Sequence, residues 1–430
     1  MNQTVEKGKT LLVDGPASVT LISGRAEVFG SSVNAANKVV IREGKRLPFA
    51  VIEKAAFDIS LGENASAEQV DEDTIPAVWT RSFEELLKVQ DKPVTVMVLG
   101  SVDSGKTSFC TYLMNRLLRE KKRVAILDGD LGQSDVGPPG TVAYTFATKP
   151  ITDLFSLEAK NAFFVGSTSP STAVDRVIQG LTLLEKEVLC SEQDFVVINT
   201  DGWVEGEEAF NYKVQLIRAL DPKVIFCIQQ KDELSSFLSI PERPVTVVDS
   251  PANIRQRTRE KRRSLRELGY IKYLRSAKVQ SLPVSWLRIE EDDVLGLSRM
   301  CENNRQAEKI YGLLGMKPLH FAELKDKILV IIGKNRWIGS DNIRRVREFT
   351  EKEVVIVRKG EEEGLLLALY NVRRKFLGIG ILREIDYARK TLKIFTPVSK
   401  EISIVSLGRV KLDKNLREIP VLDEDKPLSF

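Results

Sequence analysis

The chain has 430 residues, of which 43% are hydrophobic and 29% charged, so it is expected to fold into two or three packed domains and not to be disordered. Its formal net charge of +4 is small for this length, which restricts any nucleic-acid-binding surface to a local patch. The single histidine, His320, excludes a histidine-based catalytic triad and a multi-histidine zinc site, so the chemistry must come from carboxylates, lysine, arginine and metal ions.

The cysteines and the apolar segments indicate a protein of the cell interior. No apolar run reaches the roughly 20 residues that span a bilayer, and the polar start of the chain lacks the apolar segment of a secretory signal. We therefore expect a cytoplasmic protein that does not enter a membrane. The four cysteines form no C-x-x-C pair and are expected to be buried thiols; they are Cys110, Cys190, Cys227 and Cys301.

Residues 1–85 are expected to form an N-terminal β domain. From Leu11 onward apolar and polar residues alternate, as at Ala17, Val19 and Leu21. This period of two predicts short antiparallel strands, and dipeptides that contain glycine mark the turns between them.

Residues 86–278 are expected to form an α/β domain. From Val94 short apolar runs alternate with segments long enough for helices, which is typical of a mainly parallel sheet covered on both faces. Residues 279–430 again contain strand-like runs, with one helical stretch near Asn342 to Thr350, and are predicted to form a smaller β-rich domain. The predicted fold class is α/β, with a central domain between two β-rich ones.

A glycine-rich segment with the pattern G-x-x-x-x-G-K-[ST] follows the first of these apolar runs. It lies between a strand predicted at Val94 to Leu99 and a helix predicted from Ser108 to Arg119, which is the context of a P-loop. In such a loop backbone N–H groups surround the phosphates, a lysine reaches the β and γ phosphates, and a hydroxyl group binds Mg²⁺. The central domain is therefore expected to be a P-loop NTPase domain that binds its nucleotide through Gly100, Ser101, Val102, Asp103, Ser104, Gly105, Lys106, Thr107 and Ser108.

Two carboxylates follow the next predicted strand, Val124 to Leu127. Asp128 and Asp130 lie at the carboxyl end of this strand, which is where open α/β sheets bind their ligands. One of them can hold Mg²⁺, directly or through water, while the other accepts the proton of an attacking hydroxyl group. A solvent-exposed Asp-Gly turn is the alternative interpretation.

Two further loops also follow predicted strands. The loop 166–170, GSTSP, offers hydroxyl groups and turn amides beside the phosphates, although it is equally typical of a helix cap. The loop 199–206 carries Trp203 between two glycines. A tryptophan is usually buried in a core, but on such a loop it can also stack on a nucleic-acid base.

Residues 255–266 contain seven basic residues and one acidic residue. In a phosphoryl-transfer protein such a run can form a lid, here at about residues 253–275, whose guanidinium groups neutralise the transferring phosphate. A solvent-exposed or nucleic-acid-binding helix is the alternative. Helical spacing would place the following arginines near one face: Arg255, Arg259, Arg262, Arg263 and Arg266.

Five motifs together resemble the polynucleotide 5′-hydroxyl kinase family, which includes the kinase subunit of the eukaryotic mRNA 3′-end cleavage factor and of the tRNA-splicing machinery. They occur in the family's order and spacing through the whole central domain, whereas the flanking domains match the family in architecture alone. In its compactness the chain is similar to archaeal members. The motifs are GSVDSGKT, LDGDLGQSDVGPPGT, FVGSTSPST, INTDGWVEG and the basic run.

The resemblance implies roles for the residues that match. Lys106 and Thr107 would hold the triphosphate and Mg²⁺, and Asp130 would engage the metal and activate the 5′-hydroxyl group. Asp128 departs from the family pattern, because relatives often carry glutamate there. The lid would consist of Arg257, Arg262, Arg263 and Arg266.

The substrate side follows from the same resemblance. Gln133 would lie near the 5′-hydroxyl group, Thr168 would belong to a clasp around the terminal phosphate region, and Trp203 would stack on the terminal base. The N-terminal domain would help to hold the nucleotide base.

The predicted function is transfer of the γ-phosphate of ATP, or of another triphosphate such as GTP, to the 5′-hydroxyl end of RNA, with DNA as an open second acceptor. A catalytically silent, nucleotide-bound scaffold of an RNA-processing complex is the first alternative, and an NTPase that drives a motion is the second. The presence of Lys106, Asp130 and the arginines favours an enzyme, since a scaffold needs no proton acceptor.

Overall fold

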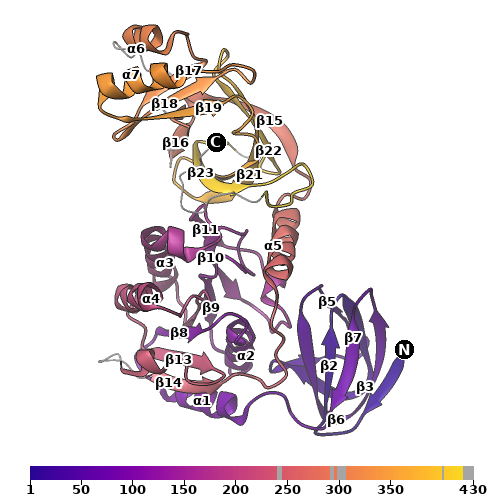
Figure 1. Ribbon diagram of the computed structural model, residues 1–430. Coiled ribbons are helices and arrows are strands. Elements are labelled where there is room, and N and C mark those ends of the chain that lie inside the picture. Colours follow the sequence, from indigo (N-terminus) through magenta and orange to yellow (C-terminus); the bar gives the residue numbers. More distant parts are fainter. Residues whose placement is uncertain (240–244, 291–294, 298–306, 400, 420–430) are drawn as a thin grey trace. The chain divides into compact units, whose positions relative to one another are not determined.

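The computed structural model describes residues 1–239, 245–290, 295–297, 307–399 and 401–419 (Figure 1). Its contacts divide the chain into two units, Met1–Arg266 and Glu267–Phe430. The first unit contains the N-terminal strands and the P-loop segment, and the second contains the C-terminal strands. The division into three domains with limits at residues 85 and 278 stays a prediction.

The N-terminal region is an antiparallel β structure, as the alternating pattern predicts. Ala17, Val19 and Leu21 are buried, while Ser18 and Thr20 between them are half-buried. Two of its strands are longer than expected, because β3 and β6 have 12 and 16 residues and pair along most of their length. The strands are β1 Asn2–Val5, β2 Thr10–Asp14, β3 Ala17–Val28, β4 Ser31–Val33, β5 Lys38–Ile41, β6 Arg46–Leu61 and β7 Ser66–Val70.

The central sheet has the strand order β11-β10-β9-β12-β8-β13-β14. The five strands from β9 to β14 in this order are parallel, whereas β10 and β11 are antiparallel. The prediction of a mainly parallel sheet is confirmed, although β10 was not predicted. The strands are β8 Val94–Gly100, β9 Val124–Asp128, β10 Thr141–Ala147, β11 Asn161–Phe164, β12 Phe195–Asn199, β13 Val224–Gln229 and β14 Val245–Asp249.

Helices cover both faces of this sheet (Figure 1). Met97 and Leu99 of β8 share one apolar core with residues of α3 and α4. On the other face Trp79 of α1 and Phe226 of β13 both contact the ring of Phe109 in α2. Burial on both faces explains why the strands read as continuous apolar runs. The helices are α1 Ala77–Lys88, α2 Lys106–Arg119, α3 Val174–Leu189, α4 Glu207–Leu220 and α5 Arg259–Tyr273, with short 3-10 turns at Leu154–Ser156, Pro170–Thr172 and Ser235–Ser239.

The second unit contains two sheets. Helix α7 confirms the helix expected near residues 342–350, whereas α6 was not predicted. The six-stranded sheet consists of β15 Lys278–Pro283, β16 Arg288–Glu290, β20 Leu365–Tyr370, β21 Phe376–Asp386, β22 Thr391–Thr396 and β23 Ile404–Lys411, with a 3-10 turn at Val284–Trp286. The three-stranded sheet consists of β17 His320–Glu323, β18 Lys327–Ile332 and β19 Glu353–Arg358, accompanied by α6 Ala307–Leu314 and α7 Ser340–Thr350.

The cysteines only partly follow the expectation of buried thiols. Cys110 and Cys227 are buried, but Cys190 is exposed because it lies at the C-terminal end of α3. Cys301 lies outside the described residues. Within the described ranges, no helix is both long and apolar enough to cross a membrane.

The buried carboxyl group of Glu185 on α3 should make the stability depend on pH. Its side chain is 5% exposed, and burial raises its pKa to about 7, with a hydrogen bond to Thr95 opposing the shift. Because the folded pKa is raised, the stabilisation is complete below the unfolded value of about 4.3 and is lost as the pH rises through 7. We expect Glu185→Gln to increase the free energy of unfolding at pH 8 by on the order of 2 kcal/mol, with little effect at pH 4.

Chemical denaturation at several pH values measures this effect. Glu187→Gln is the matched control, because Glu187 lies on the same helix and is exposed. Equal pH profiles for wild type and Glu185→Gln would contradict the assignment.

Candidate functional site

The predicted site residues gather at the carboxyl edge of the central sheet, in the first unit. Strands β8, β9 and β12 are parallel, and Asn199 at the end of β12 lies in register with Asp128 on one side and Val98 on the other. The loops that leave these strands therefore meet at one edge, where open α/β sheets bind ligands. The N-terminus of α2 begins there, at Lys106.

The P-loop is closely packed around its glycines. A Cβ atom on Gly100 would lie 2.5 Å from Ser104 Oγ and 2.8 Å from the carbonyl oxygen of Ile228, so only glycine fits. Lys106 Nζ donates a hydrogen bond to the carbonyl oxygen of Ser101, at 2.7 Å. The Ser104 hydroxyl is buried and has no hydrogen-bond partner among the described residues. The loop thus offers unsatisfied polar groups and a helix N-terminus to an anion.

Lys106 and Asp130 influence each other's charge. Burial lowers the pKa of Lys106, and the negative charge of Asp130 opposes this shift. Burial likewise raises the pKa of Asp130, against the effect of Lys106. Asp130 Oδ1 accepts hydrogen bonds from the backbone N–H groups of Gly132 and Gln133, at 3.0 and 2.9 Å, which fixes the carboxylate in its loop.

Asp128 is more deeply buried than the sequence indicates. Its carboxylate accepts hydrogen bonds from Asn199 Nδ2 and from the backbone N–H groups of Asp130, Asp135 and Val136. Burial and the nearby charge of Asp135 raise its pKa to about 7. Asp128 does not line the cavity described below, so its role as a metal ligand stays a prediction.

The side chains fit a magnesium ion that is bound together with phosphates. In the part of the chain that the structure describes, no three carboxylate, histidine or cysteine side chains converge on one point. Mg²⁺ does not need such a cluster, because it usually takes one or two protein ligands and completes its shell with water and phosphate oxygens. Thr107 and Asp130 both line the cavity and can supply these ligands. The Asn199 side-chain amide lies 3.5 Å from Thr107 Oγ1 and also donates a hydrogen bond to Asp128. The sequence motifs did not predict these two contacts.

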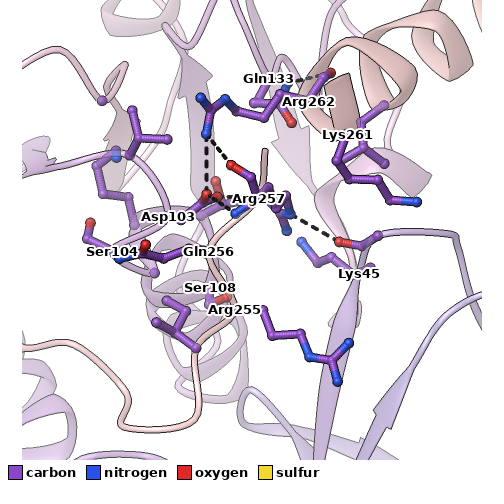
Figure 2. A pocket seen from close by; sticks show the side chains of 18 of the residues that line it. Lys45, Asp103, Ser104, Ser108, Gln133, Arg255, Gln256, Arg257, Lys261 and Arg262 are labelled. Carbon is purple, nitrogen blue, oxygen red and sulfur yellow. Dashed lines mark hydrogen bonds and ion pairs between the residues drawn. The ribbon is translucent and has the colours of Figure 1, made fainter. Parts of the chain in front are cut away.

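The basic run contacts the P-loop directly (Figure 2). Arg257 binds the Asp103 carboxylate through its backbone N–H group and through Nη1, at 2.8 and 3.1 Å. Arg262 Nη1 lies 3.6 Å from the same carboxylate, and its carbonyl oxygen accepts a hydrogen bond from Gln133. The expectation of one arginine face is partly wrong, because α5 begins at Arg259 and so Arg255 precedes the helix.

One cavity of about 1150 Å³ connects these groups. Its lining includes the P-loop from Ser101 to Ser108 and Asp130. Gly100, Asp128 and Arg263 lie outside the lining. The other predicted residues that line it are Gln133, Thr168, Trp203, Arg257, Arg262 and Arg266.

Trp203 is partly a core residue and partly a cavity residue, so its position is compatible with both interpretations of its loop. It is half-buried and packs against the core, with its ring 5.7 Å from that of Tyr212, yet it also lines the cavity. Asp201, which sequence reasoning missed, holds this loop in place. It accepts hydrogen bonds from the Trp203 backbone, the Tyr212 hydroxyl and the buried Lys213 ammonium group.

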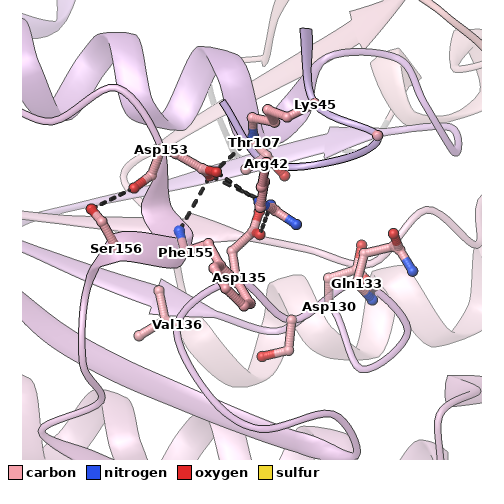
Figure 3. A network of polar contacts seen from close by, with 12 residues as sticks. Arg42, Lys45, Thr107, Asp130, Gln133, Asp135, Val136, Asp153, Phe155 and Ser156 are labelled. Atoms are coloured by element: carbon pink, nitrogen blue, oxygen red, sulfur yellow. Dashed lines mark hydrogen bonds and ion pairs between the residues drawn. The ribbon is translucent and has the colours of Figure 1, made fainter. Parts of the chain in front are cut away.

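A second charged network joins the N-terminal region to the P-loop region (Figure 3). Arg42 follows β5 and pairs with Asp135 and with Asp153, whose Oδ2 lies 2.7 Å from Arg42 Nε. Lys45 Nζ lies 3.3 Å from Asp153 Oδ1. Burial alone would lower the pKa of Arg42, but the two carboxylates outweigh it and raise that pKa. Arg42 and Lys45 both line the cavity, so the N-terminal region contributes to the site.

Removing Arg42 should destabilise the first unit. Arg42→Ala removes the arginine partner of the buried carboxylates of Asp135 and Asp153, although Asp153 keeps its ion pair with Lys45. We expect this loss to lower the free energy of unfolding by about 3 kcal/mol. Denaturation with urea measures this loss of free energy of unfolding. The control is Arg25→Ala, which removes an exposed pair with Glu53 in the same region and should cost less than about 0.5 kcal/mol. Similar losses in the two variants would contradict a structural role for the Arg42 network.

Comparison with known proteins places the site in a family. Residues 100–276 match the model of the mRNA cleavage and polyadenylation factor CLP1 P-loop family. The polyribonucleotide 5′-hydroxyl-kinase of Methanocaldococcus jannaschii is 29% identical over 354 residues, which cover 80% of this chain and 94% of that protein. The polyribonucleotide 5′-hydroxyl-kinase of Pyrococcus furiosus is 30% identical over 340 residues, which cover 78% and 92%.

A solved structure shows that the similarity extends over the whole fold. The structure of a Clp1p–Pcf11p complex matches with a TM-score of 0.66 at 13% identity, covering 96% of this chain and 97% of the matched one. At that identity it establishes the fold alone. Because the archaeal relatives match over most of both chains and the P-loop segment matches the family model, this chain belongs to the polyribonucleotide 5′-hydroxyl-kinase family of CLP1-type P-loop proteins.

Proposed function

We propose that this chain is a polyribonucleotide 5′-hydroxyl kinase, which transfers the γ-phosphate of a nucleoside triphosphate, ATP or GTP, to the 5′-hydroxyl end of RNA. The observation that carries the proposal is the cavity of about 1150 Å³, which brings the P-loop, Asp130, the arginines and Trp203 together. The relatives that match over nearly their full length carry the same activity in their names. DNA ends are an open second acceptor, and a cytoplasmic location stays a prediction.

The P-loop would hold the triphosphate. Its backbone N–H groups and the α2 N-terminus face the phosphates, and the Lys106 ammonium group would leave the Ser101 carbonyl oxygen for the β and γ phosphates. Thr107 and Asp130 would hold Mg²⁺, which neutralises charge on the phosphate oxygens when bound. Arg42, Lys45 and Phe155 line the same cavity, so the base side of the nucleotide would meet the N-terminal region.

Asp130 would act as the general base. It would accept the proton of the 5′-hydroxyl group while that oxygen attacks the γ phosphorus and the bond to the β–γ bridging oxygen breaks, which releases the nucleoside diphosphate. Asp130 lines the same cavity as the P-loop, so its carboxylate could serve both the metal ion and the attacking hydroxyl group. Gln133, Thr168 and Trp203 would position the RNA end, with the indole stacked on the terminal base.

The arginines would stabilise the charge that spreads over the transferring phosphoryl group. Arg257 and Arg262 are within reach of the P-loop through Asp103, and Arg266 lines the cavity, whereas Arg263 lies outside the lining. A phosphate group in the P-loop would compete with Asp103 for Arg257 and Arg262. Of the four predicted lid residues, Arg263 therefore has the weakest structural support.

A nucleotide-bound scaffold is the second candidate, and one observation favours it. The matched Clp1p structure contains a protein partner, Pcf11p, and an assembly role would also use this fold. A scaffold requires nucleotide binding but neither a general base nor arginines at the γ-phosphate. An NTPase would hydrolyse its nucleotide at a rate that does not depend on 5′-hydroxyl ends.

Transfer of label from γ-labelled ATP or GTP to 5′-hydroxyl RNA tests the proposal. We expect Lys106→Ala to abolish transfer, and Asp130→Asn to lower kcat by about 10²- to 10⁴-fold while the nucleotide still binds. A matched RNA that already carries a 5′-phosphate is the control and should accept no label. Absence of labelled RNA with the wild-type protein, despite nucleotide binding, would favour the scaffold.

A comparison of Arg262→Ala with a variant of a distant arginine distinguishes a role of Arg262 at the phosphate from a general effect of removing a positive charge. We expect Arg262→Ala to lower kcat by on the order of 10³-fold with little change in the melting temperature, because a guanidinium group that stabilises the transferring phosphate is lost. Arg123→Ala is the control, since Arg123 precedes β9 at the opposite edge of the sheet, and its ion pairs in the described part of the chain are with the exposed Glu192 and the half-buried Asp194. Equal rates for Arg262→Ala and wild type would exclude Arg262 from the reaction.

A further inference from the structure

Trp337, in the second unit, is a large aromatic side chain that the fold leaves in solvent. It lies in the loop between β18 and α7, and 77% of the residue is exposed. Trp79, by contrast, is fully buried. An exposed tryptophan on a short loop is therefore available for a ligand.

One cationic side chain contacts this indole, and two more lie on the same loop. Arg358 lies over its ring, with the guanidinium carbon 4.9 Å from the ring centroid. Lys334 and Arg336 are exposed on the same loop, and neither forms an ion pair with any residue that the structure describes. Among the residues that the structure describes, Glu361 is the one acidic partner of Arg358, at 3.4 Å, so these described side chains together carry a positive net charge.

The backbone brings these residues to one edge of the three-stranded sheet. β18 and β19 are parallel, with Ile332 in register with Arg358 and the Lys359 N–H group bonded to the Ile332 carbonyl oxygen. The loop 333–339 leaves β18 where β19 ends, and its first turn is closed by a hydrogen bond from the Arg336 N–H group to the Gly333 carbonyl oxygen. Such a carboxyl edge is where ligands of parallel sheets bind.

We propose that Trp337, Lys334, Arg336 and Arg358 form a binding site for single-stranded RNA outside the phosphoryl-transfer cavity. A base would stack on the indole, and the phosphates on either side would contact Lys334 and Arg336. A protein interface is the weaker alternative, because lysine is depleted in such interfaces, whereas Lys334 together with the arginines matches the charge of a phosphate backbone. The choice of RNA as the ligand rests on the proposed function.

Direct binding measurements test this site without requiring catalysis. The probe is a single-stranded RNA of about 20 nucleotides with a fluorophore at its 3′ end, titrated with the full chain and followed by anisotropy. We expect Trp337→Ala to raise the Kd about tenfold and Trp337→Phe to raise it much less, since phenylalanine retains a stacking ring. Lys334→Ala combined with Arg336→Ala should reduce the slope of log Kd against log salt by about 1.4, because two phosphate contacts are lost.

Trp286→Ala is the matched control, because Trp286 belongs to the same unit and is 75% exposed. An unchanged Kd in Trp337→Ala, or an equal rise of the Kd in Trp286→Ala, would overturn the proposal. An unchanged Kd in Trp337→Ala would favour a protein as the partner of the exposed indole. The rate of phosphorylation at saturating RNA should be the same in wild type and Trp337→Ala, since Trp337 does not line the transfer cavity. If RNA binding depends on Trp337 but the protein has no kinase activity, this site is supported and the proposed function is rejected. If the protein is a kinase but its RNA binding does not depend on Trp337, the proposed function is supported and this site is rejected.

Discussion

The buried ammonium group of Lys106 is the constraint on which the site depends. An ammonium group away from water is costly unless an anion or acceptors surround it, and here it has the Ser101 carbonyl oxygen and the charge of Asp130. Burial shifts the pKa values of both Lys106 and Asp130 toward their neutral forms. Phosphate oxygens would relieve this cost, so the fold prepares an anion site at the end of β8 before any ligand binds.

Asp103 connects the P-loop to the segment that precedes and begins α5. Its carboxylate is 6% exposed and faces both Arg257 and Arg262, so two guanidinium groups lie beside the P-loop. A second link runs through the turn after β5, where Gly44 accepts a hydrogen bond from Arg257 Nε. Gly44 also packs so tightly against Leu265 that an added Cβ atom would lie 2.8 Å from it. The P-loop, the two arginines and the N-terminal region are therefore in direct contact.

The two flanking regions serve the site differently. The N-terminal strands contribute Arg42 and Lys45 to the cavity itself, and their ion pairs with Asp135 and Asp153 are largely buried. The second unit has its own core and its own cationic edge around Trp337. The proposed RNA site on that edge would give the C-terminal region a task, which is to bind a part of the strand other than the 5′ end that reacts.

The sequence by itself determined the α/β class, the P-loop and a minority of the residues that line the cavity, because these depend on contiguous patterns: apolar strands, a glycine-rich turn and a helix start. Tertiary structure alone decided the burial of Asp128, the pairing of Asp103 with Arg257 and the Arg42 network. Such contacts join residues up to 154 positions apart, as between Asp103 and Arg257. The type of a residue determines which charge it can carry. Its burial and the charges near it depend on packing, and these two factors determine its protonation state and its role.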